Sequence, residues 1–393
     1  MVSEDGGFST LSVHAGETRD PQTGAVVTPI YETSVFAFSN TRELIEVIGG
    51  GAAGYVYTRY GNPTVRAAEK KIAELEGAED SAVFSSGMAA ITTTLFTLVS
   101  SGDHVVSTLD LYGGTLEFFK NILPKFGIEV SLVEATDFNA IASSVRRNTK
   151  VIYAETPTNP TLKIVDVAKI AKLAKRKGLT TVVDSTFASP FNIKPIQLGA
   201  DIVVHSATKY LGGHNDLTAG VVCGSSEIIQ KLKEMRKNLG CTLDPFAAWL
   251  LLRGLKTLGL RMERHNSNGM QIAEYLAKHP KVKRVYYPGL RSHPQYSIAR
   301  RQMKGFGGVV SFEVDGGSEE TMKFVENLKL CSLAASLGGT ETLVTQPTTS
   351  SHYFVNEEVR KEAGITDQLV RLALGIEDSK DIIADLEQAF NKI

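Results

Sequence analysis

The feature that most constrains the fold is a regular alternation between short apolar runs and longer amphipathic segments across residues 80–224. Seven runs rich in valine and isoleucine are typical of strands: SAVFSS, HVVSTLD, IEVSLVEA, KVIYAETP, TTVVDST, DIVVHSA and AGVVCG. Runs that are almost continuously apolar indicate strands with helices on both faces of their sheet. We therefore predict an α/β fold with a mostly parallel, doubly covered central sheet.

One segment between two of these runs has the features of a crossover helix. In VDVAKIAKLAKRKG, apolar residues at Val167, Ile170, Ala171 and Ala174 follow helical spacing. Lysines and an arginine gather toward its end, where they interact favourably with the helix dipole, and Gly178 can end the helix. This segment supports the expected order of strand, helix and parallel strand.

The pattern changes on both sides of this region, so we predict three units. Residues 1–60 are rich in glycine, threonine and proline and predict an extended arm lying across another surface. Residues 61–255 form the large α/β domain in this interpretation. Residues 256–393 predict a smaller α+β domain, with strands at KRVYYPG and GVVSFEVD and helices at EETMKFVENLK and DSKDIIADLEQAF.

Charge and cysteine content exclude several classes of protein. The 42 basic and 43 acidic residues give a net charge of −1, which offers no electrostatic footprint for nucleic acid or an anionic membrane. No apolar run approaches the ~20 residues of a membrane span. The three cysteines lack CxxC spacing, and the opening MVSEDGGFST lacks the features of a secretory signal. We expect a cytoplasmic protein without nucleic-acid or membrane partners.

The stretch DIVVHSATKYLGGHNDLTAG carries the most chemical information. Its apolar strand leads directly to Ser206, Thr208 and Lys209, at the edge of the sheet where α/β proteins bind ligands. Hydroxyl groups there can hold a phosphate, and a partly desolvated lysine becomes a usable nucleophile or base. A single loop lysine is far more often merely solvated, so this stretch alone decides little.

Two further strand ends carry groups of the same kind. In TTVVDST, Asp184 ends the apolar run. A carboxylate buried there needs a cation or a hydrogen-bond donor, such as a protonated pyridine nitrogen. Its alternative role is to cap the next turn. Ser86, Gly87 and Met88 lie at a strand-to-helix junction, where free N–H groups favour a phosphate. Small residues at such a junction also simply allow close helix packing.

Taken in order along the chain, these features resemble the Cys/Met-metabolism family of fold-type I pyridoxal-phosphate enzymes. That family includes cystathionine γ-synthases, cystathionine γ-lyases and methionine γ-lyases. The resemblance spans nearly the whole chain and rests on these stretches: HAGETRDPQTGAVVTPIYETSVF, YVYTRYGNPT, VFSSGMAA, DLYGGT, ETPTNPTL, VVDSTFASP, HSATKYLGGH, SLGGTETL and LVRLALGIED.

The resemblance implies pyridoxal 5′-phosphate as cofactor and three catalytic residues, Lys209, Tyr112 and Asp184. Lys209 would bind the cofactor covalently and shuttle protons, Asp184 would pair with the ring nitrogen, and Tyr112 would stack on the ring. The other cofactor-binding residues would be Gly87, Met88, Asn159, Ser206 and Thr208, with Tyr57 and Arg59 reaching the phosphate of the neighbouring subunit. The arm would thus complete a partner's site in a homodimer, usually doubled to a homotetramer.

On the substrate side, the resemblance implies that Arg371 receives the α-carboxylate, with Ser336 and Ala335 beside it. Most relatives acting on cystathionine carry an acid at the place of Ala335, whereas methionine γ-lyases do not. Those lyases usually carry a cysteine where this chain has Gly114. The leading expectation is γ-replacement or γ-elimination on cystathionine or an O-substituted homoserine, and methionine γ-lyase activity is the alternative.

Two other classes of function remain to be weighed against this one. A nicotinamide-dependent dehydrogenase shares the α/β rhythm but needs a GxGxxG turn after its first strand, which is missing here. A catalytically silent relative is disfavoured by the intact Lys209, Asp184 and Arg371. His205 and His214 flank Lys209 without a carboxylate at ligand spacing, so we predict no metal.

Overall fold

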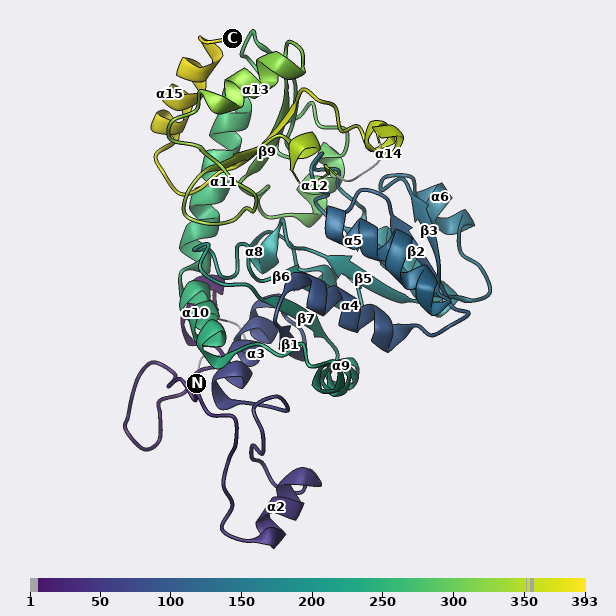
Figure 1. The fold of residues 1–393 in the computed structure, drawn as a ribbon, viewed down its shortest axis with the longest axis vertical. Coiled ribbons are helices and arrows are strands. Elements are labelled where there is room, and N and C mark those ends of the chain that lie inside the picture. The colour runs from purple at the N-terminus through teal and green to yellow at the C-terminus, as the bar shows by residue number, and fades with distance from the viewer. Residues whose placement is uncertain (1–5, 351, 354–356) are drawn as a thin grey trace.

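The computed structural model describes residues 6–350, 352–353 and 357–393. The chain is elongated, with the N-terminal arm at one end, a large sheet in the middle and a smaller sheet at the other end (Figure 1). Among the described residues, no helix has both the length and the apolar character needed to cross a membrane.

The large sheet has seven strands in the order β1-β7-β6-β5-β4-β2-β3. All seven apolar runs form strands: β1 (Asp80–Phe84), β2 (His104–Thr108), β3 (Glu129–Val133), β4 (Thr149–Glu155), β5 (Thr180–Asp184), β6 (Ile202–Ser206) and β7 (Gly220–Gly224). Strands β2 to β6 pair in parallel, while β7 runs antiparallel to both of its neighbours. The predicted α/β fold with a mostly parallel sheet is confirmed.

Helices cover both faces of this sheet, as the apolar runs require. On β6, Val203 packs into one core with α3 (Pro63–Glu76) and α10 (Pro245–Lys256). Its neighbours Ile202 and Val204 pack into the opposite core with α4 (Gly87–Leu98) and α9 (Ser226–Leu239). Because the middle of each central strand meets a helix layer on both faces, its middle residues are mostly apolar, and polar residues gather at the two ends of the strands.

The predicted crossover helix is confirmed as α7 (Val167–Lys177). Asp166 caps it by accepting a hydrogen bond from the backbone N–H of Lys169 at 3.2 Å. Gly178 ends it in the left-handed region, with φ of 67°, where glycine has no Cβ to clash.

The smaller sheet has the order β10-β11-β12-β9-β8, with strands β8 (Val282–Tyr286), β9 (Val309–Val314), β10 (Ser332–Leu333), β11 (Leu343–Thr345) and β12 (Leu369–Ala373). Helices α11 (Leu258–Leu276), α13 (Ser318–Glu326) and α15 (Ser379–Phe390) pack against one of its faces. Their apolar faces enclose a separate core around Phe312, Phe324 and Phe390. The remaining helices are α5 (Gly113–Glu117), α6 (Phe138–Ser143), α8 (Ser189–Asn192), α12 (Tyr296–Gln302) and α14 (Glu357–Glu362).

The first 60 residues are less uniform than the expected extended arm. They contain helix α1 (Phe8–His14), which packs against α3, α10 and α11, and helix α2 (Thr41–Ile48), none of whose residues is buried. The segment around α2 projects farthest from the molecule, and an earlier loop of the arm also extends outward (Figure 1). The domain boundaries at residues 60 and 255 stay predictions; they fall close to the start of α3 and the end of α10.

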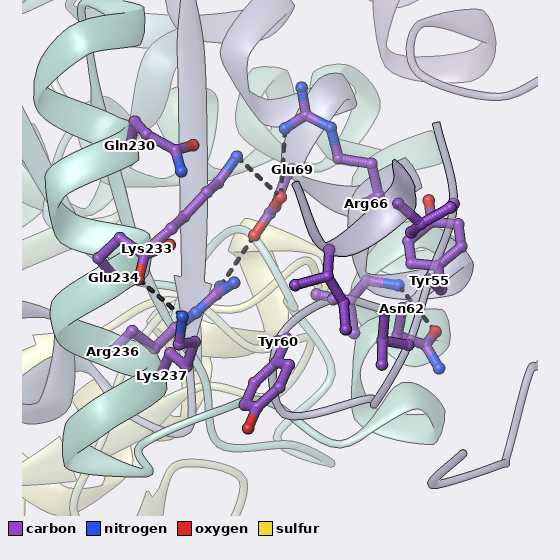
Figure 2. A pocket seen from close by; sticks show the side chains of 16 residues that line it. Tyr55, Tyr60, Asn62, Arg66, Glu69, Gln230, Lys233, Glu234, Arg236 and Lys237 are labelled. Carbon is purple, nitrogen blue, oxygen red and sulfur yellow. Dashed lines mark hydrogen bonds and ion pairs between the residues drawn. The ribbon is translucent and has the colours of Figure 1, made fainter. Parts of the chain in front are cut away.

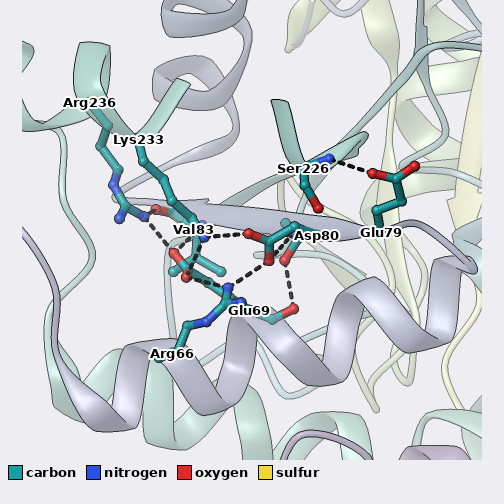
Figure 3. Close-up of polar contacts among 9 residues, drawn as sticks. Arg66, Glu69, Glu79, Asp80, Val83, Ser226, Lys233 and Arg236 are labelled. Atoms are coloured by element: carbon teal, nitrogen blue, oxygen red, sulfur yellow. Dashed lines mark hydrogen bonds and ion pairs between the residues drawn. The ribbon is translucent and has the colours of Figure 1, made fainter. Parts of the chain in front are cut away.

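A buried ion cluster joins α3, β1 and α9 (Figure 3). Glu69 pairs with Arg66, Lys233 and Arg236 at 3.2, 3.2 and 2.8 Å, and Asp80 pairs with Arg66 and Lys233 at 2.6 and 2.8 Å. Burial opposes ionisation of Glu69, but the three cations outweigh it and hold the pKa of this carboxyl below its usual value. The cluster fixes α9 against the edge of the sheet. Because the base of the arm contacts α9, the cluster also helps to position the arm.

Candidate active site

A pocket of about 490 Å³ opens where the parallel strands β4, β5 and β6 end and the smaller sheet meets them. The large sheet contributes Glu155, Asp184 and Ser206 from the ends of three strands, and the smaller sheet closes the opposite wall with Thr345 and Arg371. The pocket is lined by Ser86, Gly87, Met88, Ile91, Tyr112, Glu155, Asn159, Asp184, Thr186, Phe187, Ser206, Thr208, Lys209, Thr218, Ala335, Ser336, Leu337, Thr345, Ser350 and Arg371. The fold thus brings together every predicted site residue except Tyr57 and Arg59.

The N-terminus of α4 forms a cradle for an anion. Ser86 caps the helix by accepting from the N–H of Ala89 at 3.0 Å, while the N–H groups of Gly87 and Met88 have no partner among the described residues. A Cβ on Gly87 would lie 2.8 Å from the Cβ of Ser206, so only glycine lets the helix approach β6 this closely. Free N–H groups, the helix dipole and nearby hydroxyls together favour a phosphate.

Asp184 lies at the floor of the pocket and is 5% exposed. One of its oxygens accepts from the N–H of Thr186 at 2.9 Å, and the other accepts from the hydroxyl of Tyr153 at 3.4 Å. Burial raises the pKa of the Asp184 carboxyl although these contacts oppose the change. Among the described residues it has no ion-pair partner, so a cation at this point would stabilise its ionised form.

Lys209 follows β6 and reaches across to the smaller sheet. Its Nζ donates to the Oγ of Ser336 at 2.7 Å. Burial, together with the positive charge of Arg371, lowers the pKa of Lys209 to about 8. The side chain therefore carries a much larger neutral fraction near neutral pH than an ordinary lysine does, and the neutral amine is the form that attacks a carbonyl group.

Arg371, on β12, presents a buried guanidinium to the pocket. It donates to the Oδ1 of Asn159 at 2.9 Å and to the backbone carbonyl of Ser336 at 3.0 Å, and its Nε has no hydrogen-bond partner among the described residues. Burial lowers the pKa of Arg371 to about 10, which still leaves it charged at neutral pH. A buried guanidinium without a carboxylate partner is suited to bind one from a ligand.

Tyr112 lies at the mouth of the pocket, directly before α5, and is 48% exposed. Its backbone N–H is fixed, because it donates to the Oε2 of Glu155 at 2.9 Å. A Cβ on Gly114 would lie 2.7 Å from the Cε1 of Tyr112, so a larger residue there requires the ring to shift. The position of the Tyr112 ring therefore depends on a glycine at residue 114.

Tyr57 and Arg59 lie away from this pocket, at the base of the arm. Arg59 donates to the backbone carbonyl of Lys237 at 2.7 Å, and its guanidinium lies over the rings of Tyr57 and Tyr60 at 5.5 and 4.9 Å. A second pocket of about 420 Å³ opens between the arm and α9, with Tyr60 and Lys237 on its rim (Figure 2). Within one chain, Arg59 therefore cannot contribute to the pocket that holds Lys209.

Among the lining residues that received no role from the sequence, Thr186 and Glu155 bind backbone groups of the pocket wall. Thr186 donates its N–H to Asp184, and its Oγ1 accepts from the N–H of Ser206 at 2.8 Å, which joins the ends of β5 and β6. Glu155 accepts from two backbone N–H groups. The sequence signal for both was their place in the strand-end motifs VVDST and ETPTNP.

Comparison with known proteins decides the family. The model of the family described as Cys/Met metabolism PLP-dependent enzyme matches residues 9–391. The chain belongs to this family. Its cofactor is therefore pyridoxal 5′-phosphate, and the set of strand-end groups described above fits that molecule: an anion cradle, a carboxylate in need of a cation and a lysine of lowered pKa.

Members of the family with several activities resemble this chain closely. The L-methionine gamma-lyase of Fusobacterium nucleatum subsp. nucleatum is 47% identical over 396 residues, covering 100% of both chains. The chloroplastic cystathionine gamma-synthase 1 of Arabidopsis thaliana is 46% identical over 396 residues, covering 100% of this chain and 70% of that protein. The crystal structure of cystathionine gamma-lyase from Lactobacillus plantarum, complexed with L-serine, superposes with a TM-score of 0.93 at 42% identity, covering 99% of each chain.

Proposed function

We propose that this enzyme catalyses γ-replacement or γ-elimination in sulfur amino-acid metabolism, as cystathionine γ-synthases and γ-lyases do. It would join an O-substituted homoserine to cysteine, or cleave cystathionine to cysteine, 2-oxobutanoate and ammonia. The observation that carries the proposal is the bridge at Ser336, whose carbonyl accepts from Arg371 and whose hydroxyl accepts from Lys209. An amino-acid substrate needs both groups, a guanidinium for its carboxylate and an amine that moves protons beside it.

We assign the cofactor contacts as follows. Gly87, Met88, Ser206 and Thr208 hold the phosphate, supported by the free N–H groups at the start of α4. Asp184 would keep a proton on the ring nitrogen, Asn159 would lie near the ring hydroxyl, and Tyr112 would stack on the ring. When bound, pyridoxal phosphate supplies an electron sink for carbanions formed on the substrate.

Proton transfer is the task of Lys209 in this proposal. Its Nζ would take a proton from the substrate α-carbon and move protons at the β-carbon. A pKa of about 8 suits both directions of transfer near neutral pH. Arg371 holds the carboxylate and so fixes the α-carbon within reach of the amine, while Tyr112 stands where it can assist the departure of the γ-substituent.

The arm completes the site of a partner subunit in the proposed homodimer, which we expect to assemble further into a homotetramer. Tyr57 and Arg59 reach the partner's phosphate in this arrangement, since they lie outside the pocket of their own chain. Val26, Ile45 and Ile48 of the arm are 77%, 63% and 66% exposed in the single chain. Apolar side chains this exposed support an arm that a partner subunit covers. We also propose a cytoplasmic location, supported by three cysteines that form no disulfide.

Methionine γ-lyase activity, which converts methionine to methanethiol, 2-oxobutanoate and ammonia, is the second candidate. Ala335 favours it, because a methyl group offers no partner to the distal ammonium of cystathionine. Among the described residues that line the pocket, the acids are Glu155 and Asp184. Both are already engaged by backbone N–H groups, so neither is free to bind a substrate tail.

A substrate panel tests the proposal and separates the two candidates. The purified enzyme, loaded with pyridoxal phosphate, is given O-succinylhomoserine or O-acetylhomoserine with cysteine, then cystathionine, then methionine. Production of cystathionine, or of 2-oxobutanoate with a thiol, supports the proposal, and the ratio of kcat/KM for cystathionine to that for methionine ranks the candidates. Absence of all these products from a fully loaded enzyme contradicts it.

A further inference from the structure

Glu155 occupies an unusual place at the floor of the pocket. It ends β4 directly beside Asp184, which ends β5, because the two residues are partners in the parallel register. Register partners on parallel strands point to the same face, so two carboxyl groups share one buried environment. Glu155 is 3% exposed, and among the described residues it forms no ion pair.

Both carboxylate oxygens of Glu155 are occupied by backbone donors from two different loops. Oε2 accepts from the N–H of Tyr112, 43 residues away along the chain, at 2.9 Å. Oε1 accepts from the N–H of Asn159 at 3.0 Å. The first loop carries the ring of Tyr112 at the pocket mouth. The second carries the side-chain amide of Asn159, whose oxygen accepts from Arg371.

These contacts form a continuous chain of hydrogen bonds around the pocket. It runs from Tyr112 through Glu155 and Asn159 to Arg371, and from there through Ser336 to Lys209, with every donor and acceptor between 2.7 and 3.0 Å apart. Within this series of hydrogen bonds, Glu155 is the residue of the large sheet that holds both the loop of Tyr112 and, through Asn159, Arg371.

We propose that Glu155 is a positioning residue. It fixes the aromatic ring of Tyr112 and, through Asn159, the guanidinium of Arg371 at a defined position relative to each other. It acts through these two loops and not on the substrate. The proposal rests on the function proposed above, because it assumes that Arg371 binds the substrate carboxylate.

A carboxylate is required here for a reason of hydrogen-bond geometry. Two backbone N–H groups point at the side chain, and a carboxylate offers an acceptor on each side, whereas an amide offers one acceptor and one donor. Burial and the nearby Asp184 raise the pKa of Glu155, while the two N–H groups oppose that change. Placing a second acid beside Asp184 is electrostatically unfavourable, and the hydrogen bonds to its two acceptor oxygens offset this cost.

The test compares Glu155→Gln with Glu313→Gln in the holoenzyme. Glu313 is a matched control, since it is also buried, at 8% exposure, and accepts from the hydroxyl of Tyr286 at 2.8 Å, but it lies away from the pocket lining. We expect E155Q to lower kcat/KM about 10²-fold, mostly through KM, because a small displacement of a carboxylate-binding group has effects of that size. E313Q should stay within about twofold of the wild type.

The visible circular dichroism of the bound cofactor supplies a readout that does not depend on turnover. E155Q should change this signal, because the ring that covers the cofactor loses its anchor, whereas E313Q should not. If E155Q matches E313Q in KM and in dichroism, the proposal is wrong. If the wild type turns over none of the substrates in the panel while E155Q still changes the dichroism, the proposed function fails and the anchoring of Tyr112 stands.

A second variant covers the case in which E155Q does not fold. Glu155→Asp keeps both acceptor oxygens and the charge but withdraws them by one methylene group, so it perturbs the same contacts more gently. We expect a smaller change of the same kind, with KM rising more than kcat falls. An E155D enzyme with wild-type KM and dichroism would overturn the proposal.

Discussion

Lys209 donates a hydrogen bond from its Nζ to the Oγ of Ser336 across 2.7 Å, although 127 residues separate them in sequence. Lys209 follows the end of β6 in the large sheet, and Ser336 lies between β10 and β11 of the smaller one. Ser336 has a φ of 108°, an uncommon conformation for a residue with a side chain. This backbone lets its hydroxyl accept from Lys209 while its carbonyl accepts from Arg371, so the reactive amine is held by the contact between the two sheets.

The lowered pKa of Lys209 predicts how cofactor capture depends on pH. Only the neutral amine attacks the aldehyde, so capture should accelerate as pH rises and level off above a midpoint of about 8, not near 10.5. Mixing apoenzyme with pyridoxal phosphate in a stopped-flow instrument, and following the yellow colour across a pH series, measures this midpoint. A midpoint close to 10 would show that the amine is not desolvated as described.

Replacing Lys209 by alanine should lower turnover by several orders of magnitude. The variant loses the amine that binds the cofactor and the group that moves protons, and each function typically contributes ~10²-fold or more. Steady-state kinetics on the best substrate of the panel measures the loss. Borohydride reduction of the wild type, followed by peptide mapping, should place the cofactor on Lys209, and a labelled peptide that lacks this residue would refute the assignment.

Mixing two inactive variants tests whether the arm serves a partner subunit. In a mixed dimer of Arg59→Ala and Lys209→Ala, one site carries both defects and the other carries none. Recovery should reach about a quarter of wild-type activity, since random exchange makes half of the dimers mixed and each holds one intact site of two. If the arm completed its own chain's site, subunit exchange would restore nothing; native mass spectrometry establishes that exchange has occurred.

Much of the fold follows from local sequence, because the strands of the large sheet are apolar on both faces and the crossover helix α7 carries its own cap and glycine stop. Helix α2 was missed although its sequence is amphipathic and Asn40 caps it, because it lies in a segment whose glycine, threonine and proline content indicates irregular structure; none of its residues is buried within this chain. The pocket residues were found through strand-end motifs. The role of Glu155 was not, because the backbone N–H groups that it binds, such as that of Tyr112, leave no trace in the sequence.

Substrate choice should respond to a single change at Ala335, which lines the pocket and is exposed to it. A charge-assisted hydrogen bond to the distal ammonium of cystathionine contributes about 1.5–3 kcal/mol, or roughly 10- to 150-fold in discrimination. Ala335→Glu should therefore raise kcat/KM for cystathionine relative to methionine by a factor in this range. The cofactor spectrum should hardly change, because the side chain would act at the substrate tail.

The matched control is Ala335→Gln, which adds the same bulk without the charge. If the gain for cystathionine comes from an ion pair, the glutamine variant should show little of it, and the gain of the glutamate variant should fall as ionic strength rises. Equal effects of both variants would mean that shape and not charge selects the substrate. For the glutamate variant, a ratio of kcat/KM for cystathionine to that for methionine within about twofold of the wild type, worth only ~0.4 kcal/mol, would show that residue 335 does not face the distal group. Gly114, where a side chain would displace the ring of Tyr112, would then be the residue to change next.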